Sequence, residues 1–285
     1  MDATPGVQRV EDPDDPRLAD YAALTDARLR KRYEHQHGVL IAEGPAPVAA
    51  LVDSPYPVRS LLVAEPRLGA LPDVVARVEA PIYAVPQPVL EQVVRFRLHQ
   101  GILGCGGRLE PAGLAEVIAG ADRLLVLEGL NDHENLGALF RTARALGIGG
   151  VLLGPGCADP LYRRSVRVSM GHVLHVPFAR ATSVAELFSA LEAAGVATVA
   201  LTPSPAASEL EAIPAGAGPV ALVLGAEGPG LSDAVLGRAS YRARIPIDGA
   251  VDSLNVAAAG AIACHVLARR AGAAVTAPPA GRRGR

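Results

Sequence analysis

Short apolar runs recur along the second half of the chain, and segments with helical periodicity separate them. Their length and their content of Val, Leu and Ile are typical of buried strands. The runs lie at residues 124–128, 151–153, 173–177, 197–201, 220–224 and 242–247. Alternation of such strands with helices predicts an α/β fold, in which helices cover both faces of a parallel sheet.

The segment 133–147 shows the helical pattern clearly. Its apolar stripe consists of Leu136, Leu139, Phe140, Ala143 and Leu146. We expect Asn135 to be the N-cap and Gly147 the left-handed residue that ends the helix. Gly137 lies in the first turn, although glycine disfavours helix, and Arg141 follows one turn later on the same face. We interpret Gly137 as a gap in the helix surface along which Arg141 can reach a ligand.

Glycines cluster at residues 99–113, where the periodicity is lost, and this break divides the chain into two halves. The first half has a strand-like run at 38–44 and reads as a small α/β domain. The last helix, 254–268, is almost free of charge and rich in small residues, which suits close packing in the core or against a second subunit. We expect five segments: a disordered acidic N-terminus (1–20), a small domain (21–105), a linker (106–121), a second domain (122–271) and a disordered basic tail (272–285).

Composition narrows the class of protein. The 285 residues are 50% hydrophobic with a net charge of −2, which predicts a sizeable core and argues against indiscriminate coating of nucleic acid. No secretion signal is visible, and the longest apolar stretch, 256–268, is shorter than the roughly 20 residues that span a bilayer. The three cysteines show no metal-binding spacing. We therefore expect a cytoplasmic protein that holds no metal and contacts no membrane.

Arginines gather where an anionic partner could contact them. The stretch RLRKRY at 28–33 is either an RNA-facing edge or the polar side of a first helix, and charge alone leaves both open. The cluster RRSVR at 163–167 differs from a charged tail because it lies inside an apolar, folded stretch, but charge alone leaves an anionic partner and a solvated face equally open. The candidate RNA contacts are Arg30, Arg32, Arg144, Arg163, Arg164 and Arg167.

Loops after three strands are the places to search for a site, because parallel α/β sheets bind ligands beyond the carboxyl ends of their strands. These loops are 129–141 (GLNDHENLGALFR), 225–233 (GAEGPGLSD, with Ser232 as the cap of the next helix) and 248–255 (DGAVDSLN). GCGGRL at 104–109 lacks the third glycine of a dinucleotide-binding turn. P-loop, G-x-S-x-G and H-E-x-x-H motifs are absent from the sequence, so the common nucleotide, hydrolase and zinc sites are disfavoured.

The three loops resemble the three motifs of the SpoU (TrmH-type) RNA ribose 2′-O-methyltransferases of the SPOUT superfamily. The first motif matches at Asn135, Gly137, Arg141 and Ala143, and the second at Leu224, Gly225, Glu227 and Gly230. The third matches at Ile245, Pro246, Ser253, Leu254, Asn255 and Ala257. Three motifs in the right order, over about residues 122 to 270, are far more specific than one. The chain departs from many members at His133, where they have proline.

The resemblance implies a trefoil knot, S-adenosylmethionine as methyl donor and a homodimer whose sites form between subunits. It assigns cofactor binding to Leu224, Gly225, Gly230, Ile245, Ile247 and Leu254. It assigns catalysis to Arg141, Asn135, Glu227, Ser253 and Asn255. The first half is similar, more weakly, to small RNA-binding domains related to ribosomal proteins, which favours ribosomal RNA over transfer RNA. Transfer RNA as substrate and a non-catalytic RNA-binding assembly factor with the same fold remain the alternatives.

Overall fold

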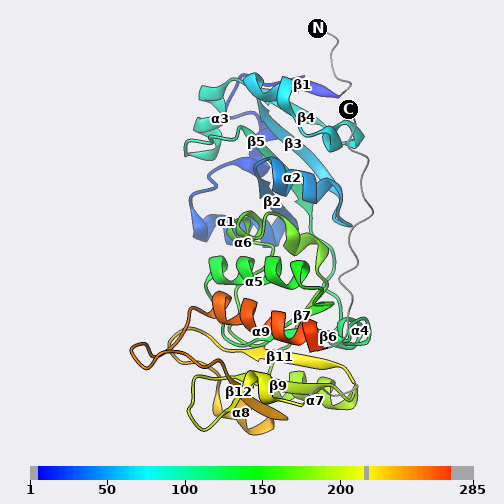
Figure 1. Cartoon of the computed structure of the whole chain (residues 1–285). Helices are drawn as coiled ribbons and strands as arrows, with labels where there is room; N and C mark the ends of the chain where they lie inside the picture. The colour runs from blue at the N-terminus through cyan, green and yellow to red at the C-terminus, as the bar shows by residue number, and fades with distance from the viewer. Residues whose placement is uncertain (1–5, 215–217, 271–285) are drawn as a thin grey trace, which may run out of the picture.

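The computed structural model of the protein describes residues 6–214 and 218–270, which form two sheets stacked along one long axis (Figure 1). We call residues 6–108 the N-terminal unit and residues 114–270 the C-terminal unit. Helices α5 and α6 lie between the two sheets (Figure 1). Among the described residues, no helix is both long and apolar enough to cross a bilayer.

The N-terminal unit contains a five-stranded mixed sheet in the order β1-β4-β3-β5-β2. β5 runs antiparallel to both β3 and β2, and the other pairs are parallel. Its strands are β1 (Val7–Arg9), β2 (Val39–Glu43), β3 (Val58–Ala64), β4 (Ile82–Val85) and β5 (Ile102–Gly107). Its helical segments are η1 (Pro16–Tyr21), α1 (Ala27–His37), α2 (Pro45–Val52), η2 (Glu65–Ala70), η3 (Asp73–Arg77) and α3 (Gln87–Val94).

Part of the expected disordered N-terminus belongs to this unit. β1 pairs with β4, and Leu18 in η1 is buried. The buried hydroxyl of Tyr21 lies 2.8 Å from Ser60 Oγ in β3. The prediction of disorder was therefore wrong for residues 6–20, because it rested on their acidic composition and overlooked the few apolar residues that pack into the unit. Residues 1–5 and the expected tail at 272–285 lie outside the described residues.

The C-terminal unit contains a seven-stranded sheet in the order β10-β12-β9-β11-β6-β7-β8, and every pair is parallel. Its strands are β6 (Arg123–Leu127), β7 (Gly150–Leu153), β8 (Phe178–Arg180), β9 (Ala197–Leu201), β10 (Ser208–Glu209), β11 (Val220–Leu224) and β12 (Tyr241–Arg244). Its helical segments are α4 (Leu114–Ala119), α5 (His133–Ala145), α6 (Arg163–Val168), η4 (His172–His175), α7 (Val184–Ala193), η5 (Leu210–Ala212), α8 (Asp233–Arg238) and α9 (Val256–Arg270).

Both faces of this sheet are buried, as the predicted α/β fold requires. Leu125 and Leu127 of β6 point to one face and pack in a cluster with α5 and α9. Leu124 and Val126 point to the other face and pack in a cluster with α4, α7 and α8. The continuous apolar runs of the sequence therefore reflect strands that are covered on two sides.

Several predicted boundaries were wrong. The strand expected at 242–247 is β12, which ends at Arg244, so Ile245 and Ile247 lie in the segment that follows it. Residues 173–177 were expected to be a strand, but η4 occupies most of this run and β8 begins at Phe178. A short apolar run does not distinguish a buried strand from a buried helical turn, and Val173 and Leu174 are buried in the shared core. The expected linker 106–121 contains the end of β5 and helix α4, whose Val117 is buried against the C-terminal sheet.

The two units share one hydrophobic core. A continuous cluster of buried side chains includes Val48 and Leu51 of α2 together with Val166 of α6 and Leu174 of η4. At this junction, a Cβ atom on Gly171 would lie only 2.4 Å from the Cβ of Ala50, so the backbones approach closely. The N-terminal unit is therefore packed directly against α6 and η4.

Candidate cofactor and catalytic site

A cavity of about 420 Å³ opens at the carboxyl ends of β9, β11 and β12, the edge at which parallel α/β sheets bind ligands. All six residues expected to bind the cofactor line it: Leu224, Gly225, Gly230, Ile245, Ile247 and Leu254. One wall of the cavity was not predicted, and it consists of Leu201, Thr202 and Pro203. No motif marks these residues, and their place directly at the end of an apolar strand was the available signal.

The loop after β11 folds tightly on itself. A Cβ atom on Gly225 would lie 2.3 Å from the carbonyl carbon of Gly230 and 2.5 Å from the nitrogen of Leu231. The N–H of Gly230 donates to the carbonyl of Ala226 at 3.0 Å, and Gly228 and Gly230 have φ of +86° and +71°. Glycine is therefore required at 225 for close approach within the loop, and at 228 and 230 for left-handed backbone.

The carboxylate of Glu128, directly after β6, anchors the end of this loop to the neighbouring strand. Its Oε2 accepts a hydrogen bond from the N–H of Ser232 at 2.8 Å, and its Oε1 accepts from Ser232 Oγ at 2.7 Å. Ser232 Oγ also accepts from the N–H of Val235 at 3.3 Å, which confirms the predicted cap of α8. Glu128 was missed, although an acid immediately after an apolar strand lies at the site-forming edge of the sheet.

Three of the five predicted catalytic residues form one hydrogen-bonded cluster at the rim of the cavity. Asn255 Nδ2 donates to Asn135 Oδ1 at 2.9 Å and to Glu227 Oε1 at 2.6 Å. Asn255 Oδ1 accepts from the N–H groups of Ala257 at 3.0 Å and Ala258 at 3.2 Å, so the side chain also caps α9. These acceptor contacts fix the orientation of the amide and direct its NH₂ group toward the two oxygens.

The other two predicted catalytic residues make no hydrogen bond to any described residue through their side chains. Ser253 is exposed and lines the cavity. Arg141 is exposed on α5 and is not among the residues that line the cavity. Burial lowers the pKa of His172, which lies in η4, and nearby positive charges lower it further; they belong to Arg141, His175 and Arg144. The exposed side of α5 and η4 is therefore basic.

The N-terminus of α5 differs from the prediction. Asp132 is the N-cap, and its Oδ1 accepts from the N–H of Asn135 at 2.8 Å. Asn135 therefore lies inside the first turn, and its side chain is available to accept from Asn255. At the other end of the helix, the φ of +66° at Gly147 confirms the predicted left-handed residue.

Gly137 has a different role from the one we expected. It is buried, and a Cβ atom there would lie 2.7 Å from the carbonyl oxygen of Ser165 and 3.0 Å from the Cβ of Val168. Both neighbours belong to α6, so Gly137 allows α5 and α6 to pack closely. The interpretation of Gly137 as a surface gap for Arg141 was wrong, because glycine can serve a ligand or a neighbouring helix equally well.

Two of the six arginines that were expected to contact RNA are enclosed within the protein. Arg30 is only 3% exposed and pairs with Glu34 at 3.3 Å. Arg163 is largely enclosed, where it pairs with Glu43 and donates to the carbonyl of Leu24 at 3.1 Å. Carboxylates draw both guanidinium groups into the protein, so these two predictions were wrong. The other four are at the surface: Arg32, Arg144, Arg164 and Arg167.

The fold and the site together define an α/β protein with a small-molecule cavity at the strand ends and an amide–carboxylate cluster at its rim. A model of the SpoU rRNA Methylase family matches residues 122–265. An uncharacterized tRNA/rRNA methyltransferase of Mycobacterium tuberculosis is 44% identical over 261 residues, which are 91% of each chain. The chain belongs to the SpoU rRNA methylase family, which confirms the resemblance seen in the three motifs.

Solved structures support the same relationship over both units. The crystal structure of an rRNA methyltransferase from Sinorhizobium meliloti is similar with a TM-score of 0.78 and 27% identity. The structure of the AdoMet-bound rRNA methyltransferase from that organism gives a TM-score of 0.79 and 28% identity. Each match covers 93% of this chain and 98% of the other chain, so the N-terminal unit is part of the similarity.

Proposed function

We propose that this protein transfers the methyl group of S-adenosylmethionine to a ribose 2′-hydroxyl in structured RNA, with ribosomal RNA as its substrate. One observation carries the proposal: the predicted cofactor residues surround a single cavity, and Asn135, Glu227 and Asn255 meet at its rim. Family membership and the AdoMet-bound relative support the choice of methyl donor.

The lining of the cavity fits this cofactor. Its volume of about 420 Å³ is in the range of small-molecule sites. Leu224, Ile245 and Leu254 offer an apolar surface for the adenine ring, whereas the carboxylates of Glu227 and Asp252 suit the positive charges of the methionine part. S-Adenosylmethionine supplies an electrophilic methyl group on a sulfonium centre when it is bound.

The residues of the chain would act mainly by positioning and electrostatics. In-line transfer requires the ribose oxygen to be held along one axis with the methyl carbon and its leaving group. Arg141 stays protonated at ordinary pH, so we assign it to the adjoining phosphate and to the negative charge that develops on the 2′-oxygen. The proton of the 2′-hydroxyl would leave to the phosphate or to water as the oxygen takes the methyl group. Asn135, Glu227 and Asn255 would orient the reacting groups, and Ser253 would contribute its exposed hydroxyl on the substrate side.

The proposed RNA surface consists of exposed arginines on both units. Arg32 lies on α1 of the N-terminal unit, Arg144 lies on α5, and Arg164 and Arg167 lie on α6. Phosphate contacts of this kind give affinity without sequence readout. Ribosomal RNA is favoured because the rRNA methyltransferase from S. meliloti resembles this chain over both units.

We also propose a homodimer with shared sites. Arg141 does not line the cavity of its own chain, which is consistent with service to the cofactor of a partner chain. The outer face of α9 offers a contact surface, since Ala258, Ile262 and His265 are exposed and Ile262 is apolar. A two-fold contact through such a face would be self-complementary.

The expected trefoil knot is part of the same proposal. The loop 225–231 and the segment 245–255 line one cavity, although β12 separates them in sequence. α9 then returns to pack on α5, where a Cβ atom on Gly260 would lie 2.4 Å from Leu139 Cδ2. We propose that the segment before α9 threads the loop after β11.

Methyl transfer tests the activity directly. Ribosomal RNA from cells that lack the gene is incubated with the protein and with S-adenosylmethionine that carries a labelled methyl group, and 2′-O-methyl positions are mapped. We expect label at a ribose of ribosomal RNA, and Arg141→Ala should bind the cofactor but transfer little. Binding of S-adenosylmethionine without transfer to ribosomal or transfer RNA would favour the non-catalytic alternative.

Mixed dimers test the shared site. Arg141→Ala and Asn255→Ala are each expected to be inactive. If the two residues act from opposite chains, each mixed dimer has one intact site, and subunit exchange restores up to about a quarter of wild-type activity per total protein. Absence of rescue despite proven exchange, or a monomer in sedimentation, would contradict the shared site.

A further inference from the structure

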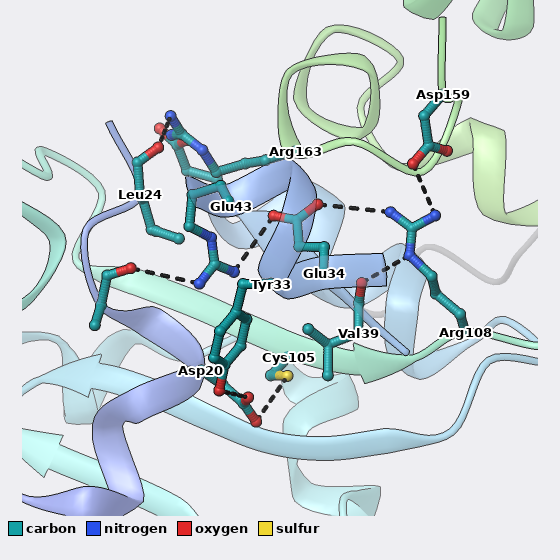
Figure 2. Close-up of polar contacts among 12 residues, drawn as sticks. Asp20, Leu24, Tyr33, Glu34, Val39, Glu43, Cys105, Arg108, Asp159 and Arg163 are labelled. Carbon is teal, nitrogen blue, oxygen red and sulfur yellow. Dashed lines mark hydrogen bonds and ion pairs between the residues drawn. The ribbon is translucent and has the colours of Figure 1, made fainter. Parts of the chain in front are cut away.

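Among the described residues, three arginine–carboxylate ion pairs cross the junction between the units, and the two more enclosed ones run in opposite directions (Figure 2). The third joins Arg167 of α6 to Glu43 at 3.3 Å and lies nearer the surface. Arg108 follows β5 in the N-terminal unit, and its Nη1 lies 2.8 Å from Asp159 Oδ2 in the loop between β7 and α6. Arg163 of α6 pairs with Glu43 at the end of β2. We call Arg108, Asp159, Arg163 and Glu43 the interunit clasp.

The clasp is shielded from solvent and tied to the backbone. Its four side chains are between 12% and 18% exposed. Arg108 Nε donates to the carbonyl of Val39 at 2.8 Å, and Arg163 donates to the carbonyl of Leu24 at 3.1 Å (Figure 2). Each guanidinium therefore donates to a backbone carbonyl of the N-terminal unit. Arg108 connects that unit to the loop after β7 through Asp159, and Arg163 connects it to α6 through Glu43.

This arrangement is poorly explained as a device for stability alone. Arg108 Nη2 lies 3.5 Å from Glu34 Oε2, but neither atom has a hydrogen-bond partner, and Arg30 Nε beside them has none either. Burial raises the pKa of Glu34, although Arg30 and Arg108 oppose the shift. Buried charges with unsatisfied atoms are often no more stabilising than apolar side chains of the same size, but they can select one arrangement.

The rest of the interface does not fix the orientation of one unit on the other, so the ion pairs of the clasp can set it. The shared apolar core favours contact between the units, but hydrophobic attraction is not directional. Residues of both units line a groove of about 1450 Å³, and Arg108, Asp159 and Arg163 of the clasp are among them, so the units do not touch along the whole junction. Charge-assisted hydrogen bonds of guanidinium groups have defined geometry and resist sliding.

We propose that Arg108 and Arg163 are positioning residues that fix the orientation of the N-terminal unit on the C-terminal unit and thereby select which ribose of a bound RNA reaches the site. The inference rests on the proposed function, because it uses the N-terminal unit as an RNA-binding surface. RNA bound to the N-terminal unit moves together with that unit. A small rotation of the unit therefore changes which nucleotide lies next to the cofactor site. A misplacement of about 1 Å at a reacting centre can lower a rate by about 100-fold.

The test uses Arg108→Gln, Arg163→Gln and their combination in the full chain. Arg238→Gln is the matched control, because its pair with Glu192 at 2.8 Å joins α8 to α7 within one unit. Three quantities are measured: cofactor affinity, kcat/KM with position mapping on RNA, and the distance between spin labels on cysteines introduced at Glu79 and Ala193. These label positions are exposed and lie in different units.

We expect the clasp variants to bind S-adenosylmethionine as the wild type does, because neither arginine lines the cavity. The label distances should broaden, and kcat/KM should fall about tenfold or more, with methylation spread to neighbouring nucleotides. Arg163→Lys keeps a positive charge beside Glu43 and should restore part of the loss seen in Arg163→Gln. Arg108→Lys keeps the charge, so it supplies a folded variant if Arg108→Gln unfolds.

Folded clasp variants that keep the wild-type label distances and methylate the same nucleotide at the wild-type rate would overturn the proposal. A uniform loss of stability with an unchanged methylation position and unchanged distances would also overturn it, because the clasp would then be structural only. If the wild-type protein transfers no methyl group to RNA, the proposed function fails, but the label distances still decide whether the clasp fixes orientation.

Discussion

Replacement of Gly225 by alanine tests the geometry of the proposed cofactor loop with the smallest available change. The added Cβ would lie 2.3 Å from the carbonyl carbon of Gly230 and 2.5 Å from its oxygen, and both are backbone atoms. Gly225 is not among the glycines with positive φ, so backbone conformation is not the obstacle. The contact must be relieved by displacement of residues 225–231 themselves.

The free-energy cost of Gly225→Ala can be estimated from this contact. Overpacking by a methyl group costs about 1–3 kcal/mol, and rigid backbone neighbours place Gly225→Ala in the upper part of that range. Residues 227–230 are exposed, so the loop can move without disruption of the β11 core. We therefore expect the strain to appear as a loss of binding, with an affinity for S-adenosylmethionine about 10–100-fold lower and little change in melting temperature.

Isothermal calorimetry with S-adenosylmethionine measures this loss, and Gly237→Ala is the matched control. Gly237 lies in α8, close in sequence to the loop, and a Cβ atom there would meet no atom within 4 Å. Alanine in a helix is favourable by about 1 kcal/mol relative to glycine, so the control should bind normally and be as stable as the wild type or more. Wild-type affinity in Gly225→Ala would refute the assignment of this loop to the cofactor site.

Three further predictions follow from the contacts described above. Gly137→Ala should lower the free energy of unfolding by about 1–3 kcal/mol in chemical denaturation, because its Cβ would lie 2.7 Å from the backbone oxygen of Ser165. Asn255→Ala removes the α9 cap and should cost about 1 kcal/mol in the same assay, together with most of the methyl transfer. His172 has a pKa below its ordinary 6.5, so its contribution to stability is complete above pH 6.5 and is lost as the pH falls through the folded-state pKa. His172→Gln should remove this part of the pH dependence of the unfolding free energy, and an unchanged pH profile would contradict it.

Much of the architecture of the C-terminal unit could be predicted from the sequence because most of its strands are apolar runs, whereas the exposed two-residue strand β10 (Ser208–Glu209) carries no such signal. Residues 197–201 and 220–224 are β9 and β11 with the predicted bounds. These runs are continuous and apolar since helices cover both faces of the sheet. The run at 173–177 failed because its apolar side chains are buried through a helical turn, and burial alone does not specify backbone conformation.

The roles of single charged and glycine residues were harder to predict because they depend on distant partners. Arg163 looked like an RNA contact within a basic cluster, but Glu43, which is 120 positions away, turns it inward. For Arg30 the sequence does contain a local indication of pairing, since Glu34 lies four residues later on the same helix. Gly137 was recognised as unusual, but the sequence gives no indication that α6 would be its neighbour.

The cluster at the cavity rim indicates why the family motifs occur in three separate pieces. Asn255 caps α9 with its oxygen and donates to Asn135 and Glu227 with its nitrogen, so one amide connects α9, α5 and the loop after β11. Any shift of α9 along its axis would therefore move the Asn255 donor relative to both acceptors. If α9 forms the proposed dimer contact, association of two chains would hold the same amide in place. Subunit assembly and alignment of the catalytic cluster would then depend on one helix, and a variant that weakens the α9 contact should lose methyl transfer before it loses the fold.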